Sequence, residues 1–160
     1  MNPIKLLSII TLFFSVSVCA QTESVINTNN LYGAWNCKLT KVDGESKIAF
    51  DIDVNYVRNG SANSFGTLKF DLPEIAELEY SIATSSTWEI KEGYLIETST
   101  ETKVVSISHP ELDSIINLES MFPQNITESS KILELTSTKL SMELEGDGTA
   151  FNCTKLKNKT

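Results

Sequence analysis

Alternation of apolar and polar residues at every second position recurs along most of this chain. In the clearest case, the stretch 48–56, the apolar positions are Ile48, Phe50, Ile52, Val54 and Tyr56. A period of two with one apolar face indicates a half-buried β-strand. Similar short runs, separated by turn signals such as Asn59-Gly60 and Gly146-Asp147-Gly148, predict further strands near residues 31–37, 68–72, 132–135, 140–144 and 149–156.

The longest predicted hairpin covers residues 80–104 and turns at Glu92-Gly93. One face of its first strand is formed by Tyr80, Ile82, Thr84, Ser86, Trp88 and Ile90. One face of its second strand is expected to hold Tyr94, Ile96, Thr98, Thr100, Thr102 and Val104, with Glu97, Glu101 and Lys103 on the other face. If the two faces point inward, they combine apolar ends with a hydroxyl-rich centre.

The periodicity changes after this hairpin. Ser108 and Glu111 are spaced like a capping box, and apolar residues then follow at helical spacing until Pro123. The pattern predicts a short amphipathic helix over 109–121, which would act as a lid or plug one end of the domain.

About eight strands in sequential hairpins, with one inserted helix, predict a mainly β fold: an antiparallel up-and-down barrel over residues 31–157. Cys37 lies in the first strand and Cys153 in the last. A disulfide between them would tie the first strand to the last, which suggests that the meander closes on itself. An eight-stranded barrel has room inside for side chains or one small ligand. Residues 21–30 are polar and are expected to form a flexible tail.

Residues 1–20 have the layout of a secretory signal: Lys5, an apolar run, and small residues before Gln21. The apolar run is too short and too interrupted for a membrane span of about 20 residues. An alternative is a lipid anchor at Cys19, which Val18 disfavours because a small residue normally precedes such a cysteine. The chain is therefore expected to be exported, to a periplasm or outside the cell, where a disulfide persists.

The formal net charge is −8, and removal of Lys5 with the leader would make it −9. This acidity argues against binding to nucleic acid or to anionic membranes, both of which rely on basic patches. It would suit a cationic protein partner, or simply keep the protein soluble. Four glycosylation triplets are no more than the composition gives by chance; they begin at Asn59, Asn125, Asn152 and Asn158.

Gly33-Ala-Trp35, at the start of the first strand, resembles the Gly-x-Trp signature of lipocalin-like (calycin) barrels. The strand count, the meander order and the closure of first strand on last are also similar to that group. The resemblance implies a small apolar or amphipathic ligand in the barrel, with Trp35 plugging the closed end and no catalytic residues to carry over. A departure is the helix, which lipocalins place after the eighth strand.

Few residues suggest catalysis, a metal or a cofactor, and none of the three is predicted. His109 is the single histidine and is interpreted as a helix-start residue. Asp51 and Asp53 share a polar strand face that could bind a cation, although a solvated face explains them better. The acidic run 143–148 lacks the ligand spacing of a calcium loop.

The hydroxyl-rich centre of the long hairpin is the predicted ligand site. Its residues are Tyr80, Thr84, Ser86, Trp88, Tyr94, Ile96, Thr98, Thr100 and Thr102. Buried hydroxyls need hydrogen-bond partners, which a ligand or water could supply. Alternatively, the hairpin extends beyond the barrel and both of its faces are exposed to solvent. The leading hypothesis is a non-enzymatic binding protein, the second is an inhibitor-type or immunity-type module that binds a protein, and an enzyme ranks third.

Overall fold

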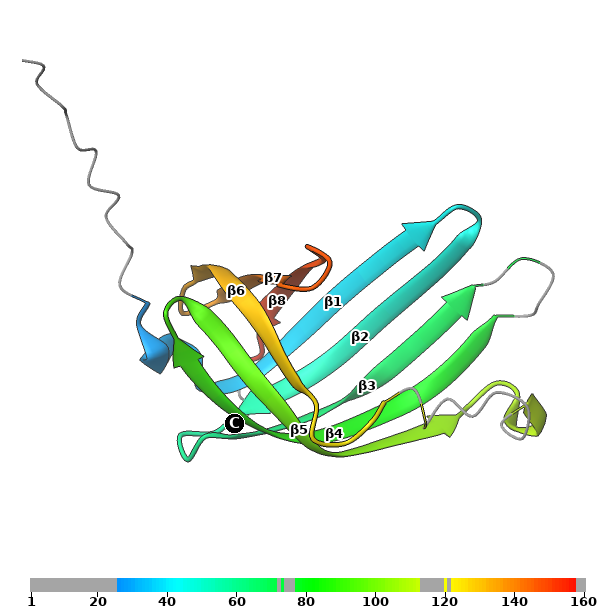
Figure 1. The fold of residues 1–160 in the computed structure, drawn as a ribbon, viewed down its shortest axis with the longest axis horizontal. Coiled ribbons are helices and arrows are strands. Elements are labelled where there is room, and N and C mark those ends of the chain that lie inside the picture. The colour runs from blue at the N-terminus through cyan, green and yellow to red at the C-terminus, as the bar shows by residue number, and fades with distance from the viewer. Residues whose placement is uncertain (1–25, 72, 74–76, 113–119, 121, 158–160) are drawn as a thin grey trace, which may run out of the picture.

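Eight antiparallel strands follow one another around a closed barrel (Figure 1). The computed structural model describes residues 26–71, 73, 77–112, 120 and 122–157. The strands are β1 (Gly33–Asp43), β2 (Ser46–Tyr56), β3 (Ser61–Asp71), β4 (Leu78–Lys91), β5 (Tyr94–Ser106), β6 (Thr127–Leu135), β7 (Lys139–Leu144) and β8 (Ala150–Lys155). Each strand pairs with the next, and β1 pairs with β8. The up-and-down barrel predicted from the sequence is confirmed.

The two ends of the barrel are built differently because the strands differ in length. Strands β1 to β5 have 11 to 14 residues, whereas β6 to β8 have 6 to 9. Strand β6 pairs with β5 only over Tyr94–Thr98, and β8 pairs with β1 only over Trp35–Lys38. The ring is therefore complete near Trp35, and β1 to β5 continue beyond it as a curved sheet (Figure 1).

Trp35 fills the closed end of the barrel. It is fully buried, and its indole Nε1 donates a 2.7 Å hydrogen bond to the carbonyl oxygen of Leu31. The ammonium of Lys155 lies 4.3 Å from the centre of the indole ring, which allows a cation–π contact. It also donates to the carbonyl oxygens of Asn30 and Tyr32. These contacts hold the chain before β1 against the end of β8. Trp35 therefore plugs the closed end of the barrel, which is the structural role that the resemblance implies.

Part of the predicted amino-terminal tail is ordered against this end. Thr28–Asn30 form the short 3-10 helix η1, whose first turn is capped by the side chain of Asn27. Ile26 packs against the core cluster. Residues 21–25 and the predicted leader 1–20 lie outside the described part of the chain.

Most of the buried apolar residues belong to two clusters. The closed-end cluster contains Leu31, Trp35, Val54, Tyr56, Ala62, Leu95, Ile132, Leu140, Met142 and Cys153. The open-end cluster contains Leu68, Leu78 and Tyr80, and partly buried residues pack against it: Ile48, Phe50, Phe70, Val104 and Phe122. The ends of the long strands are therefore apolar inside, and the space between the two clusters is where polar side chains can face inward.

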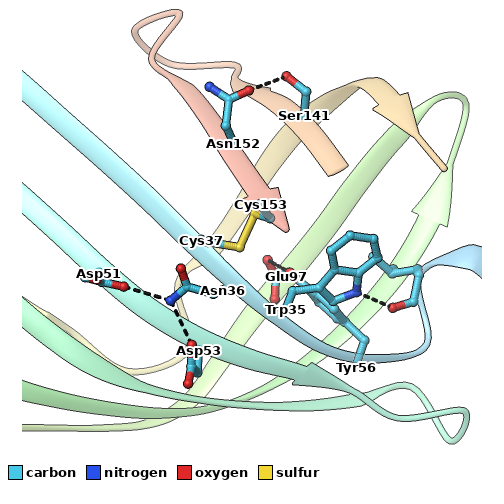
Figure 2. Close-up of a disulfide and its surroundings, with 11 residues drawn as sticks. Trp35, Asn36, Cys37, Asp51, Asp53, Tyr56, Glu97, Ser141, Asn152 and Cys153 are labelled. Atoms are coloured by element: carbon cyan, nitrogen blue, oxygen red, sulfur yellow. Dashed lines mark hydrogen bonds between the residues drawn. A yellow bond between two sulfur atoms is a disulfide. The ribbon is translucent and has the colours of Figure 1, made fainter. Parts of the chain in front are cut away.

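The predicted disulfide between Cys37 and Cys153 is present, and it links residues 116 positions apart in the sequence (Figure 2). The two cysteines are direct neighbours across the β1–β8 pair, which is the seam where the barrel closes. Cys153 is 3% exposed and belongs to the closed-end cluster. The bridge therefore locks the seam from the inside.

The predicted helix over 109–121 is described only in part. Residues Pro110–Leu112 form the 3-10 helix η2, and residues 113–119 and 121 lie outside the described chain. The expected capping box is corrected: the hydroxyl of Ser108 accepts a 2.9 Å hydrogen bond from the backbone N–H of Glu79. Ser108 therefore anchors the end of β5 to the start of β4.

Candidate functional site

Strand β4 places hydroxyl groups between the two apolar clusters, as its sequence pattern predicts. Tyr80 lies in the open-end cluster, whereas Trp88 packs against the closed-end cluster. Thr84 and Ser86 lie between them on the same face and are only half-buried. Both face the concave side of the sheet yet remain partly accessible, so solvent reaches this part of the interior.

Neighbouring strands add two more hydroxyls to this region. Thr84 lies opposite Ser64 of β3 and opposite Thr102 of β5, and directly paired residues in an antiparallel sheet project from the same face. The Oγ1 atoms of Thr84 and Thr102 are 3.3 Å apart, within hydrogen-bond distance. Thr102 is 6% exposed. A belt of hydroxyls therefore lines the interior between the clusters; its members include Ser64, Thr84, Ser86 and Thr102.

Strand β5 departs from the predicted alternation at a β-bulge. Ser85 pairs with Glu101 but Ser86 pairs with Ser99, so Thr100 is one residue too many for the ladder. The hydroxyl of Thr100 donates a 3.0 Å hydrogen bond to the carbonyl oxygen of Ser85. Because of this extra residue, the inward-facing residues of β5 have odd numbers before Thr100 and even numbers after it.

The bulge corrects the predicted inner face of β5. Leu95 is 1% exposed and lies in the closed-end cluster, so the residues next to it in the strand, Tyr94 and Ile96, point outward. Thr98 also points outward, and its Oγ1 lies 2.8 Å from that of Thr127. Beyond the bulge, Thr102 and Val104 face inward as expected.

Consequently the nine predicted ligand residues are not all brought together. Five share the barrel interior: Tyr80, Thr84, Ser86, Trp88 and Thr102. The outward side chains of Ile96 and Thr98 instead help to line a shallow depression of about 240 Å³ on the outer surface of β4 and β5. Thr100 sits at the bulge itself.

The same bulge brings in a carboxylate that sequence reasoning placed on the outside. Glu97 lies opposite Trp88 on β4 and opposite Glu128 on β6, and its Oε2 accepts a 3.2 Å hydrogen bond from the hydroxyl of Tyr56 (Figure 2). Protein surrounds most of the carboxyl group, although part of the residue still reaches solvent. Burial raises the pKa of Glu97 to about 7; the hydrogen bond from Tyr56 lowers it, and the charge of Glu128 raises it further.

Aromatic rings surround the approach to Glu97. The ring of Tyr56 meets that of Trp88 edge-on, with centroids 5.8 Å apart, and Tyr32 lies at the same distance on another side of Trp88. The indole Nε1 of Trp88 donates to the carbonyl oxygen of Ser61, which fixes the ring orientation. Burial next to Glu97 also raises the pKa of Tyr56 well above its usual range, so Tyr56 remains a hydrogen-bond donor.

The other acidic residues considered from the sequence lie on the outer surface. Asn36 donates hydrogen bonds to both Asp51 and Asp53, on the face of β1 opposite to Trp35 (Figure 2), and Lys38 forms a 2.7 Å ion pair with Asp51. These contacts hold the pKa of Asp51 below its usual value. They make a solvated, paired surface and leave no free carboxylate pair for acid–base chemistry.

The acidic run 143–148 and His109 likewise have local roles. Asp147 forms a 2.6 Å ion pair with Lys41 and accepts a hydrogen bond from the backbone N–H of Thr149 in the β7–β8 turn. The Nδ1 atom of His109 lies 3.0 Å from a carboxylate oxygen of Glu111. Within the described ranges, no three His, Cys, Asp or Glu residues are grouped as ligands of a metal ion.

Comparison with solved structures finds several similar chains. A solved lipocalin-like protein from Bacteroides uniformis superposes with a TM-score of 0.41 and 18% identity, covering 79% of this chain and 99% of that one. No family model and no curated protein matches the sequence. The closed eight-stranded up-and-down barrel agrees with the architecture that the Gly-x-Trp resemblance implies. Among the described residues, no helix is long and apolar enough to cross a membrane.

Proposed function

We propose that this protein is an exported, non-enzymatic binding protein that holds a small amphipathic molecule inside its barrel. The observation that carries the proposal is the partly accessible interior between two apolar clusters, where the hydroxyl belt and Glu97 face inward. Ligand sites are typically apolar with a few placed polar groups that orient the ligand. This interior has that composition.

Export is supported by two features of different kinds. The first 20 residues have the layout of a secretory signal, and the barrel seam carries a disulfide between Cys37 and Cys153. Structural disulfides are maintained mainly in oxidising compartments such as a periplasm or the extracellular space. Both features support the proposal that the mature protein is exported to one of these compartments.

A protein-binding module is the second candidate, and the unequal strand lengths favour it. In the described chain, β8 does not reach residues 39–43 of β1, and neither β6 nor the residues just before it pair with residues 100–106 of β5. Unpaired strand edges can accept a strand from another protein. With a net charge of −8, a cationic partner would be favoured.

Native mass spectrometry of the mature protein, purified gently from its own exported compartment, tests the first proposal. A mass excess equal to one small molecule, lost on denaturation, is the expected result. A ligand-free mass in every preparation, together with salt-sensitive capture of one basic protein, would overturn it in favour of the second candidate. The same spectra report whether the disulfide is intact.

A further inference from the structure

We propose that the interior site selects a ligand with a protonated amine, and that the carboxylate of Glu97 is the anchor for that amine. The inference rests on the proposed function and adds the chemical class of the ligand. It is drawn from the surroundings of Glu97: one hydrogen-bond donor, two aromatic rings and no counter-charge in the described chain.

Glu97 has no positively charged partner among the described residues. None of the ion pairs formed by the described residues includes Glu97 or the opposite residue Glu128. The hydroxyl of Tyr56 supplies a hydrogen bond but no positive charge. An ionised carboxylate in such a place is poorly stabilised, and a cation within about 4–6 Å would stabilise it. A ligand amine provides that cation together with several N–H donors.

Aromatic side chains lie beside the carboxylate of Glu97. Trp88 lies directly across the β4–β5 ladder from Glu97, and the ring of Tyr56 packs edge-on against it. Aromatic faces attract ammonium groups, with tryptophan the strongest, and a carboxylate beside them adds a direct ionic contact. A neutral alcohol or a fatty acid would gain neither interaction.

Apolar residues of the barrel interior suit the part of the ligand that follows the amine. Inward apolar residues continue from the Glu97 region toward the open-end cluster, through Ile82 on β4 and then Leu68 and Tyr80. Because these residues are already buried, an apolar chain attached to the amine would pass the half-buried hydroxyls of the belt and contact the partly buried residues around the open-end cluster, such as Phe50. The chemistry on both sides of the belt therefore suits an amphiphile with a basic head.

Binding of an amine by Glu97 should depend on pH. The titratable groups that face Glu97 from packed strands are Tyr56 on β2 and Glu128 on β6; on β4 its neighbour is the uncharged Trp88, and the cysteines of β1 and β8 are joined in a disulfide. Because burial raises the pKa of Glu97 to about 7, acidification below neutrality protonates the anchor. Amine affinity should then fall by up to about tenfold per pH unit.

The experiment compares three probes of equal chain length by titration calorimetry: dodecylamine, dodecanol and dodecanoate, each below its aggregation limit. The variants are Glu97→Gln, which keeps the shape of the side chain, and Glu101→Gln, a matched control exposed on the outer face of the same strand. At pH 8 we expect the unmodified protein and Glu101→Gln to bind dodecylamine at least about tenfold more tightly than dodecanol, and Glu97→Gln to bind the two about equally.

The outcomes separate the two proposals. If all three probes bind equally well to the unmodified protein, or dodecanoate binds best, the amine inference is wrong while the binding barrel stands. If no probe binds, both fail. A pH titration of the unmodified protein is an independent check that needs no variant: loss of dodecylamine affinity between pH 8 and 5, with constant dodecanol affinity, supports Glu97 as the anchor, and parallel curves overturn it.

Discussion

Lys155 joins three segments of the chain at the closed end of the barrel. Its ammonium donates to carbonyl oxygens of the segment before β1 and lies over the ring of Trp35. Hydrogen bonds from charged donors contribute roughly 1.5–3 kcal/mol. Replacement Lys155→Met keeps the apolar stem and removes the donor, so we expect the free energy of unfolding to fall by about that amount. Urea unfolding of Lys155→Met beside Lys157→Met, an exposed control, measures it; equal midpoints would contradict it.

Gly66 is required where β2 and β3 approach each other most closely. A Cβ atom at this position would overlap the carbonyl oxygen of Asp51 and would lie 2.7 Å from the Cα of Ile52. Because both are backbone atoms, the strands must separate. We expect Gly66→Ala to destabilise the protein by roughly 1–3 kcal/mol. Gly146→Ala is the matched control, since a Cβ there meets nothing within 4 Å; a Gly66→Ala midpoint as high as the control's would show that the strands can relax.

The carboxyl group of Glu97 makes folding stability depend on pH near neutrality. Its pKa is raised from an ordinary 4.5 to about 7, chiefly by burial, so between these values the folded protein binds more protons than the unfolded chain. Stability should therefore decrease as pH rises from about 4.5 to 7. Urea midpoints measured at pH 5 and 7.5 should differ in that direction. The difference should shrink in Glu97→Gln; an unchanged difference would assign the pH dependence to other groups.

At the scale of the element, the facing of β5 can be tested directly. Leu95 is 1% exposed inside the closed-end cluster, whereas Ile96 lines the shallow outer depression. Truncation of a buried leucine costs about 2–5 kcal/mol. We expect Leu95→Ala to show a loss in that range and Ile96→Ala a much smaller one, measured by urea unfolding. The reverse order would restore the face predicted from the sequence pattern.

The comparison of β4 with β5 shows why sequence patterns succeed for one strand and fail for its neighbour. On β4 the large apolar residues all lie on one face, at Tyr80, Ile82, Trp88 and Ile90, so the inner face could be read directly. The first residues of β5 are apolar on both faces, Tyr94 and Ile96 on one and Leu95 on the other. The following Ser and Thr residues carry no marker for a bulge. The register shift at Thr100 depends on pairing with β4, which no local pattern contains.

Glu97 was missed for the same reason. A glutamate in a strand is normally placed on the solvent face, as Glu101 and Lys103 are. Its inward position follows from the bulge three residues later and from the distant Tyr56, 41 positions earlier in the sequence. The hydroxyls of β4 could be predicted as a site from their own strand, whereas the carboxylate could be found only once the strands were assembled.

At the scale of the whole molecule, one end of the barrel is closed and the other end is open. Three short strands, β6 to β8, complete the ring only around Trp35, while the longer β1 to β5 continue past it (Figure 1). The hydrogen-bonded seam between β1 and β8 is consequently short, with partners only from Trp35 to Lys38. Few hydrogen bonds therefore join the first strand to the last, and the disulfide lies among them.

The disulfide should therefore contribute a large share of the stability. It closes a loop of 116 residues, and the chain-entropy model assigns about 4.7 kcal/mol to a loop of roughly 100 residues. A typical domain has only about 5–15 kcal/mol in total. We expect the double variant Cys37→Ser/Cys153→Ser to lose several kcal/mol in urea unfolding, and added reductant to affect the unmodified protein but not the variant. An unchanged midpoint in the double variant would mean that the β1–β8 seam holds the barrel closed by its hydrogen bonds and packing alone.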